Sequence, residues 1–153
     1  MRWVRLWARF FWFAAGEYLG GRHPRYVNNR ETLGREIFSS KQFYRSTRAI
    51  NKNVFQAPRN RWDISCTRLS LFRRQMAVEI ARRHGASHQK PRTFYGFAEI
   101  AVSAVREVEV EINGTPQFDN PFHADIELPR DDGPDLLLLI AVKLASRAKF
   151  SPA

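Results

Sequence analysis

The sequence predicts an α+β domain, and three patterns along the chain support this class. Residues 135–149 form a mostly apolar run of helical length, and residues 74–84 place apolar side chains at helical spacing. Residues 107–112 instead alternate strictly between glutamate and valine or isoleucine, which is the pattern of a half-buried strand. Because both periods occur in one chain, we expect a small mixed sheet packed by a buried C-terminal helix, with a separate N-terminal helix.

Length and composition fit one globular domain preceded by a short extension. The chain has 153 residues, 44% of them hydrophobic, and its single cysteine excludes an intramolecular disulfide. The sequence has no apolar run of the roughly 18 to 20 residues that cross a bilayer. We therefore predict a soluble, cytoplasmic protein, with a tryptophan- and arginine-rich segment and linker at 1–30 and one α+β domain at 31–153.

The charge is divided unevenly along the chain. The formal net charge is +10, but residues 1–93 hold 20 basic and 5 acidic residues, whereas residues 94–153 hold 5 basic and 10 acidic residues. Such asymmetry is typical of a surface that faces a polyanion. Arginine supplies 20 of the 25 basic residues. Its planar fork suits phosphate, although coding bias also produces arginine-rich chains.

Residues 1–19 predict an amphipathic helix, for which three interpretations stay open. Arg2, Arg5 and Arg9 are three and four positions apart and share a helical face, while aromatic residues such as Trp3 and Trp7 fill much of the remainder. The segment is a helix packed on the domain, a loose extension, or a helix that lies on a membrane surface. We expect the first, and a membrane role would involve this segment alone.

Residues 41–62, which we call the basic arm, are the most basic and least regular part of the chain. Its candidate nucleic-acid-binding residues are Lys41, Arg45, Arg48, Lys52, Arg59 and Arg61. They interleave with aromatic residues, namely Phe43, Tyr44, Phe55 and Trp62. Cations hold phosphates and aromatic rings stack on bases, so the pattern suits single-stranded or irregular nucleic acid. Alternatively, the rings anchor an extended arm whose charges are only solvated.

The residues on either side of the arm predict regular elements. Residues 32–43 have apolar residues at helical spacing and predict a short helix, and residues 63–72 predict a strand that contains Cys66 as a small buried residue. The helix at 74–84 is expected to end at Gly85. This glycine separates His84 from His88, so we expect two loop histidines and no metal site.

The second half of the chain predicts two strands and two helices. After Gly96 we expect a short helix, followed by the strand at 107–112 with its glutamates outward and a turn at Asn113-Gly114. Residues 122–128 predict a further strand.

The last helix has recognisable start signals. Asp131 and Asp132 are candidate caps, and Pro134 suits the first turn. Residues 136–141 are apolar without a break, so we expect the helix to be covered on nearly all sides.

One polar cluster stands against the predicted core. Strand alternation puts His123 and Asp125 on the same face, where they could act as a general base and the carboxylate that orients it, with Arg73 binding a phosphate. The alternative is a structural or solvated pair. The sequence contains no phosphate-binding loop, no dinucleotide fingerprint and no cysteine–histidine metal spacing, so we expect no cofactor.

Three short motifs stand out in order along the chain. IFSS begins at Ile37, RLSLFR spans 68–73, and HADIELP spans 123–129 before a helix. In this order the chain resembles a set of small uncharacterised bacterial proteins with an LSxFR strand and an HAxI…P strand-to-helix unit. The resemblance covers about residues 32–149, implies a domain boundary near residue 30, and singles out Arg73 and His123.

Three functional hypotheses follow. The first is a small binding protein that contacts nucleic acid through the basic arm, in a mobile-element or phage-defence context. The second is a small enzyme that acts on a nucleotide or other phosphate-containing substrate through His123. The third is an interaction module whose basic part meets an acidic protein partner, or which forms a homodimer. We favour the first.

Overall fold

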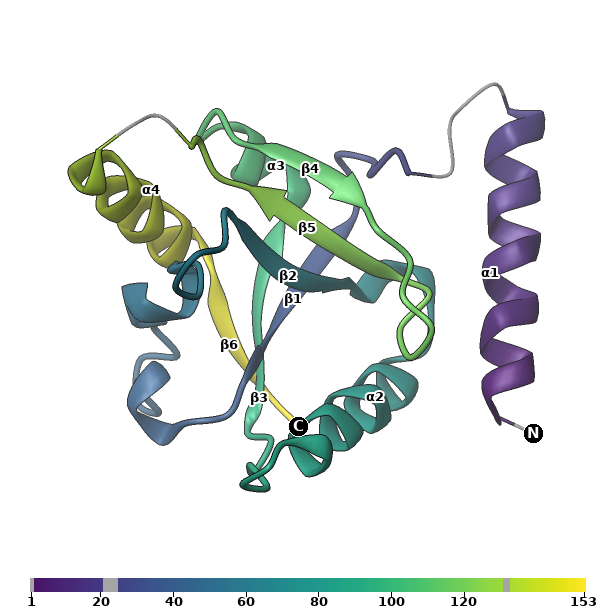
Figure 1. Ribbon diagram of the computed structural model, residues 1–153, viewed down its shortest axis with the longest axis horizontal. Helices are drawn as coiled ribbons and strands as arrows, with labels where there is room; N and C mark the ends of the chain where they lie inside the picture. The colour runs from purple at the N-terminus through teal and green to yellow at the C-terminus, as the bar shows by residue number, and fades with distance from the viewer. Residues whose placement is uncertain (1, 21–24, 131–132) are drawn as a thin grey trace.

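The computed structural model describes the chain apart from residues 1, 21–24 and 131–132 (Figure 1). The α-helices are α1 (Arg2–Leu19), α2 (Arg74–Ser87), α3 (Val102–Arg106) and α4 (Pro134–Arg147). The strands are β1 (Thr32–Ile37), β2 (Asp63–Arg68), β3 (Gly96–Ala101), β4 (Glu111–Gly114), β5 (His123–Glu127) and β6 (Lys149–Pro152). Short 3₁₀ helices are η1 (Ser40–Gln42), η2 (Lys52–Phe55) and η3 (Leu69–Leu71).

The strands form one sheet in the order β4-β5-β2-β1-β3-β6, and its five pairings are all antiparallel. The α+β class is therefore confirmed, with an antiparallel rather than a mixed sheet. The predicted caps Asp131 and Asp132 lie outside the described residues, as do the side chains of Arg2 and Trp3.

One face of the sheet builds the main core. Ile64 and Cys66 of β2 lie on this face beside their β5 partners Ile126 and Ala124. The helix α4 covers this face together with η2 and contributes the fully buried Leu144. Burial raises the pKa of the Cys66 thiol to about 12, so Cys66 is the small buried residue that the sequence predicts.

A second apolar cluster joins α1 and α2 to the segments that lead out of β2 and into β5. Phe122 stacks on Phe72 at a ring-centroid distance of 4.8 Å and meets Phe10 of α1 edge-on at 5.8 Å. Leu6 and Phe10 are buried in this cluster with Ile80 of α2. The helix α1 therefore packs on the domain, as the first interpretation of residues 1–19 predicts.

Two segments that were expected to be helical contain strands. Residues 32–37 form β1 instead of a helix. Leu33 and Ile37 are four positions apart, and this spacing fits a strand face as well as a helix face. Residues 96–101 form β3, and the helix α3 follows only at 102–106. Phe97 packs in the second cluster while Ala98 and Ile100 pack in the main core, so β3 is buried on both faces and shows no alternation.

Several predicted boundaries are also wrong. The strand expected at 107–112 begins only at Glu111, and the strand expected at 63–72 ends at Arg68. Asn113 and Gly114 lie inside β4, opposite Asp125 and Ala124, instead of forming a turn. Gly85 lies inside α2, where a Cβ atom would meet the carbonyl oxygen of Arg92 at 2.5 Å. The chain leaves the last helix at Ala148, and residues 149–152 pair with β3 as β6.

The helix α4 is only half covered, which corrects the expectation that it is buried on all sides. Ile140 and Leu144 face the core, whereas Leu136, Leu139 and Val142 are exposed, with Leu139 at 47%. Pro134 lies in the first turn of this helix, as predicted, but the N-cap residue is Gly133, so neither predicted aspartate occupies the cap position.

Candidate functional site

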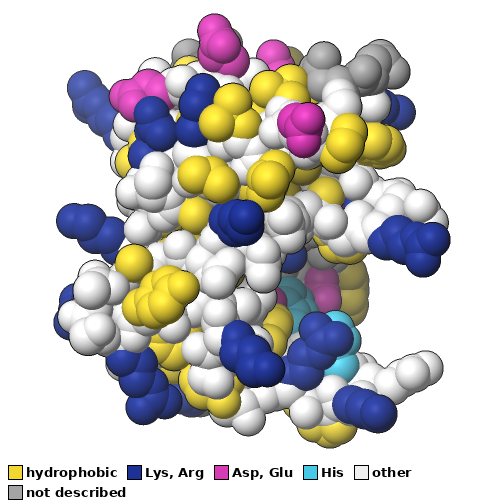
Figure 2. Space-filling model, turned by 90° about the vertical axis from the view of Figure 1, so that its left-hand side faces the viewer, with side chains coloured by type: hydrophobic (Ala, Val, Ile, Leu, Met, Phe, Trp, Pro, Cys, Tyr) yellow, Lys and Arg dark blue, Asp and Glu magenta, His cyan; other side chains and the backbone are white. Residues whose placement is uncertain are grey.

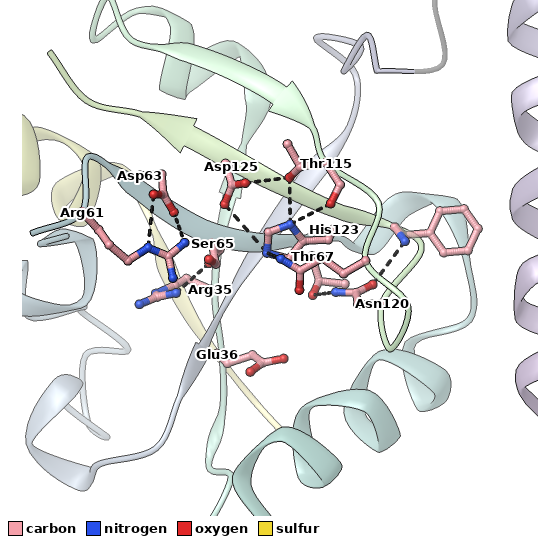
Figure 3. Close-up of polar contacts among 12 residues, drawn as sticks. Arg35, Glu36, Arg61, Asp63, Ser65, Thr67, Thr115, Asn120, His123 and Asp125 are labelled. Carbon is pink, nitrogen blue, oxygen red and sulfur yellow. Dashed lines mark hydrogen bonds and ion pairs between the residues drawn. The ribbon is translucent and has the colours of Figure 1, made fainter. Parts of the chain in front are cut away.

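His123 and Asp125 project from the same face of β5, as the alternation predicts, and β5 lies inside the sheet between β4 and β2 (Figure 3). Their β2 partners on this face are Thr67 and Ser65, so the face opposite the main core is polar at this position. Thr115, which follows β4, reaches over to both residues. The antiparallel register thus brings together three polar side chains that are up to ten positions apart in sequence.

The ring of His123 is held on both sides. Its Nδ1 lies 3.1 Å from the carbonyl oxygen of Thr115 and 2.8 Å from the Thr115 hydroxyl, which itself donates to Asp125 Oδ2 at 2.7 Å. Since a carbonyl oxygen only accepts, Nδ1 carries the proton in this arrangement. Nε2 can then accept from the side-chain amide of Gln117 at 3.3 Å.

This arrangement favours neutral His123. Burial lowers its pKa below the ordinary value, while Asp125 and the Thr115 carbonyl oppose the shift. His123 is only 5% exposed. A general base must reach the proton that it removes, and here both nitrogens already have partners in the loop at 115–122. The geometry therefore favours His123 as a residue that fixes this loop on the sheet.

Asp125 has one unsatisfied oxygen. Its Oδ1 is buried and accepts no hydrogen bond from the described residues, and it lies 3.8 Å from His123 Nε2. If Nε2 were protonated, the Asp125 carboxylate would therefore lie beside it. The same loop is fixed a second time by Asn120, whose amide donates to Thr67 Oγ1 at 2.8 Å.

A second histidine centre, which the sequence does not predict, lies nearby. His84 of α2 contacts Glu36 of β1 through Nδ1 at 2.9 Å and Asp119 of the loop through Nε2 at 3.0 Å. The hydrogen bond with Glu36 is the main cause that raises the pKa of His84, which favours imidazolium between two carboxylates. His84 is thus an interior helical residue that links three elements, and not the loop residue that was expected.

Figure 2 shows histidine and acidic side chains inside a recess, with lysine and arginine side chains around it. Within the described part of the chain, no three His, Cys, Asp or Glu side chains are arranged to hold a metal ion.

Arg73, the third candidate catalytic residue, is not in this group. It precedes α2 and lines a groove between α1 and α2 together with Arg5 and Arg9. The structure therefore brings His123 and Asp125 together and places Arg73 in a different site.

The basic arm presents most of its predicted cations to solvent. Lys41, Arg45, Arg48, Lys52 and Arg59 are exposed, and none of them forms an ion pair within the described part of the chain. Arg61 differs, because its guanidinium donates to Asp63, with Nε 3.2 Å from Oδ1, and this contact raises its pKa.

The arm is anchored by some of its aromatic residues and exposes others. Phe43 stacks on Phe150 of β6 at 3.8 Å, and Phe55 is fully buried. Tyr44 is 58% exposed and Trp62 is 39% exposed. Anchoring therefore accounts for two of the four rings, and the other two are accessible.

A shallow depression of about 320 Å³ lies at the anchor. Phe43, Tyr95 and Phe150 supply its aromatic walls, and Arg45 and Arg48 stand beside them. Arg48 adopts a left-handed backbone conformation with φ of 57°, which turns the chain between the two arginines and the second half of the arm.

Comparison with known protein families, with curated protein sequences and with solved structures gave no match for this chain. The resemblance to small bacterial proteins stays a prediction. No described helix is long and apolar enough to cross a membrane.

Proposed function

We propose that this protein binds single-stranded or irregular nucleic acid through the basic arm. The observation that carries the proposal is the set of five exposed cations without ion-pair partners in the described part of the chain, on a segment that also exposes Tyr44 and Trp62. Unpaired cations can neutralise phosphates at no cost of breaking an internal ion pair. Exposed rings can stack on unpaired bases.

The surface around the arm supports this proposal. Figure 2 shows lysine and arginine side chains spread over the face that contains η1 and η2, with acidic side chains mainly towards its upper edge. Arg45 and Arg48 also border the depression lined by aromatic rings. The arm therefore offers backbone neutralisation and ring contacts on one surface, which is the combination found in proteins that bind single strands.

The first experiment is a titration of labelled single-stranded RNA and of duplex DNA with the full chain at several salt concentrations. If four to five cations contact phosphates, the logarithm of the binding constant for single strands should fall with a slope of about −3 against the logarithm of the salt concentration. Replacing Arg45→Glu together with Arg48→Glu should weaken binding by about tenfold or more and make the slope shallower by about 1.4.

The matched control is Arg5→Glu together with Arg9→Glu, which changes the net charge equally but lies on α1. Equal losses in the two variants would show that only net charge matters and would contradict a site on the arm. Absence of binding at low salt would also contradict it. Tyr44→Ala with Trp62→Ala should reduce affinity for single-stranded RNA more than for duplex DNA, since bases in a duplex are already stacked.

A further inference from the structure

The helix α1 presents two different apolar faces. One face is buried against the domain through Leu6 and Phe10. The opposite face is apolar and lies in solvent, and its large residues are Val4, Phe11, Trp12, Tyr18 and Leu19. Trp12 is 84% exposed and Tyr18 is 77% exposed.

The exposed face is continuous along the helix. Val4, Ala8, Phe11, Ala15 and Tyr18 follow one another at spacings of three and four, so they form one stripe, and each of them is exposed. No charged residue occupies any of these positions. A stripe of this length and exposure exceeds the single surface hydrophobes that need no explanation in a soluble domain.

A cationic groove runs along one side of the same helix. It has a volume of about 950 Å³ between α1 and α2, and its basic lining residues are Arg5, Arg9, Arg73, Arg82 and Arg83. Glu79 is the one acidic residue in the lining, and it pairs with Arg83 at 2.8 Å. The apolar stripe is therefore flanked by an excess of arginine.

We propose that α1 docks the protein on a membrane surface that contains anionic lipids. In this arrangement the stripe enters the boundary between headgroups and acyl chains, Trp12 and Tyr18 lie at the interface, and the arginines of the groove bind lipid phosphates. The helix lies along the surface and does not cross it, consistent with the absence of a spanning helix in the described residues.

The charges favour a lipid surface over a second copy of the chain. A second copy that docked through the same stripe would bring the same five arginines to the interface, and like charges repel there. Lipid phosphates are complementary to them. Figure 1 also shows α1 at one side of the molecule with all other elements on its inner side, so that a flat surface can approach the outer side.

This inference is independent of the proposed function, because the basic arm lies on the other side of the sheet from α1 (Figure 1). A protein docked through α1 would hold the arm away from the membrane. Both surfaces could then be occupied at the same time.

The test is co-sedimentation of the full chain with vesicles of phosphatidylcholine alone and of phosphatidylcholine with phosphatidylserine at about three to one. The protein should bind the mixed vesicles and bind neutral vesicles far more weakly. Phe11→Ala with Trp12→Ala should lower binding to mixed vesicles about tenfold or more, because two large rings no longer enter the interface. Arg5→Gln with Arg9→Gln should reduce the difference between mixed and neutral vesicles.

Two control variants separate α1 from other parts of the protein. Leu139→Ala with Val142→Ala removes exposed apolar side chains from α4, and Arg45→Glu with Arg48→Glu removes charge from the arm; both should keep nearly normal vesicle binding. The proposal is overturned if either control loses as much binding as Phe11→Ala with Trp12→Ala. It is also overturned if mixed vesicles do not bind, or if the α1 variant only abolishes a concentration-dependent dimer.

Discussion

The two ends of the molecule, α1 and the basic arm, have the same kinds of side chains but different surfaces. Both are rich in arginine and aromatic residues. In α1 the helical period sorts them, so that Arg5 and Arg9 line a groove while Phe11 and Trp12 lie on the exposed stripe. The arm has no long regular element, and its cations and rings remain interleaved.

The difference teaches that composition alone does not set the partner of such a segment. A helix that separates rings from charges suits an interface between an apolar and an anionic layer. An irregular segment that alternates them suits a strand of nucleic acid, in which phosphates and bases also alternate. The following predictions test whether the two ends behave as separate units.

The largest effect is expected from Phe122→Ala. Phe122 is almost fully buried and contacts Phe10 and Phe13 of α1 as well as Phe72. Its loss should lower the free energy of unfolding by about 4 kcal/mol, because the cavity lies where α1 meets the domain. Hydrogen exchange should become faster in α1 while protection in the arm changes much less.

The control for this variant is Phe118→Ala. Phe118 is the most exposed large apolar residue among those described, and its hydrogen bond with Trp7 uses its backbone carbonyl, not its ring. Its effect should be within about 0.5 kcal/mol. Equal loss of protection in α1 and the arm on Phe122→Ala would show that the two ends unfold together.

A smaller effect, about 3 kcal/mol, is expected from Phe43→Ala, which removes the ring that stacks on Phe150. The arm should lose protection from exchange and affinity for RNA, although Phe43 itself is buried. The helix α1 should keep its protection. Tyr44→Ala, at the exposed neighbouring position, should leave stability within about 0.5 kcal/mol. A loss of protection in α1 would contradict the separation.

The smallest effect concerns His84 and depends on pH. The pKa of His84 in the folded protein is raised above its ordinary value of 6.5, mainly by the hydrogen bond with Glu36. Its contribution to stability is therefore complete below pH 6.5 and is lost as the pH rises through the folded-state pKa. His84→Gln should therefore reduce the loss of stability that occurs as the pH rises above 6.5. Thermal unfolding over a pH series measures it.

His123 acts in the opposite direction and provides the internal check. Burial lowers its pKa, so its contribution is present above 6.5 and is lost as the pH falls through the folded-state pKa. The His84→Gln variant should still lose stability as the pH falls, because His123 is unchanged in it. An unchanged pH profile in this variant would show that the contacts of His84 with Glu36 and Asp119 contribute nothing to stability.

Patterns with one clear period predict the fold class, the helices α1, α2 and α4, and the strand with His123. Residues 32–37 could not be predicted, because Leu33 and Ile37 fit both periods, and β3 could not, because both of its faces are buried. Burial of Leu139 could not be decided either, since a leucine-rich pattern does not tell which neighbours cover it.

The sites divide in a similar way. Alternation placed His123 and Asp125 on one face correctly, since that depends only on neighbouring positions. The sequence groups Arg73 with them, but the distance between Arg73 and His123 depends on the tertiary structure, which places Arg73 in the groove between α1 and α2. Glu36 was not recognised as a partner of His84 because it is 48 residues away and belongs to a strand that was predicted as helix.

The order of the strands has a consequence for self-association. The sheet ends at β4 and β6, which are only four residues long, and β6 carries Lys149 and Pro152 while β4 carries Glu111. Short borders with charges and a proline are poor templates for the addition of a foreign strand. Fibre-like growth by strand pairing is therefore disfavoured at both edges of the sheet.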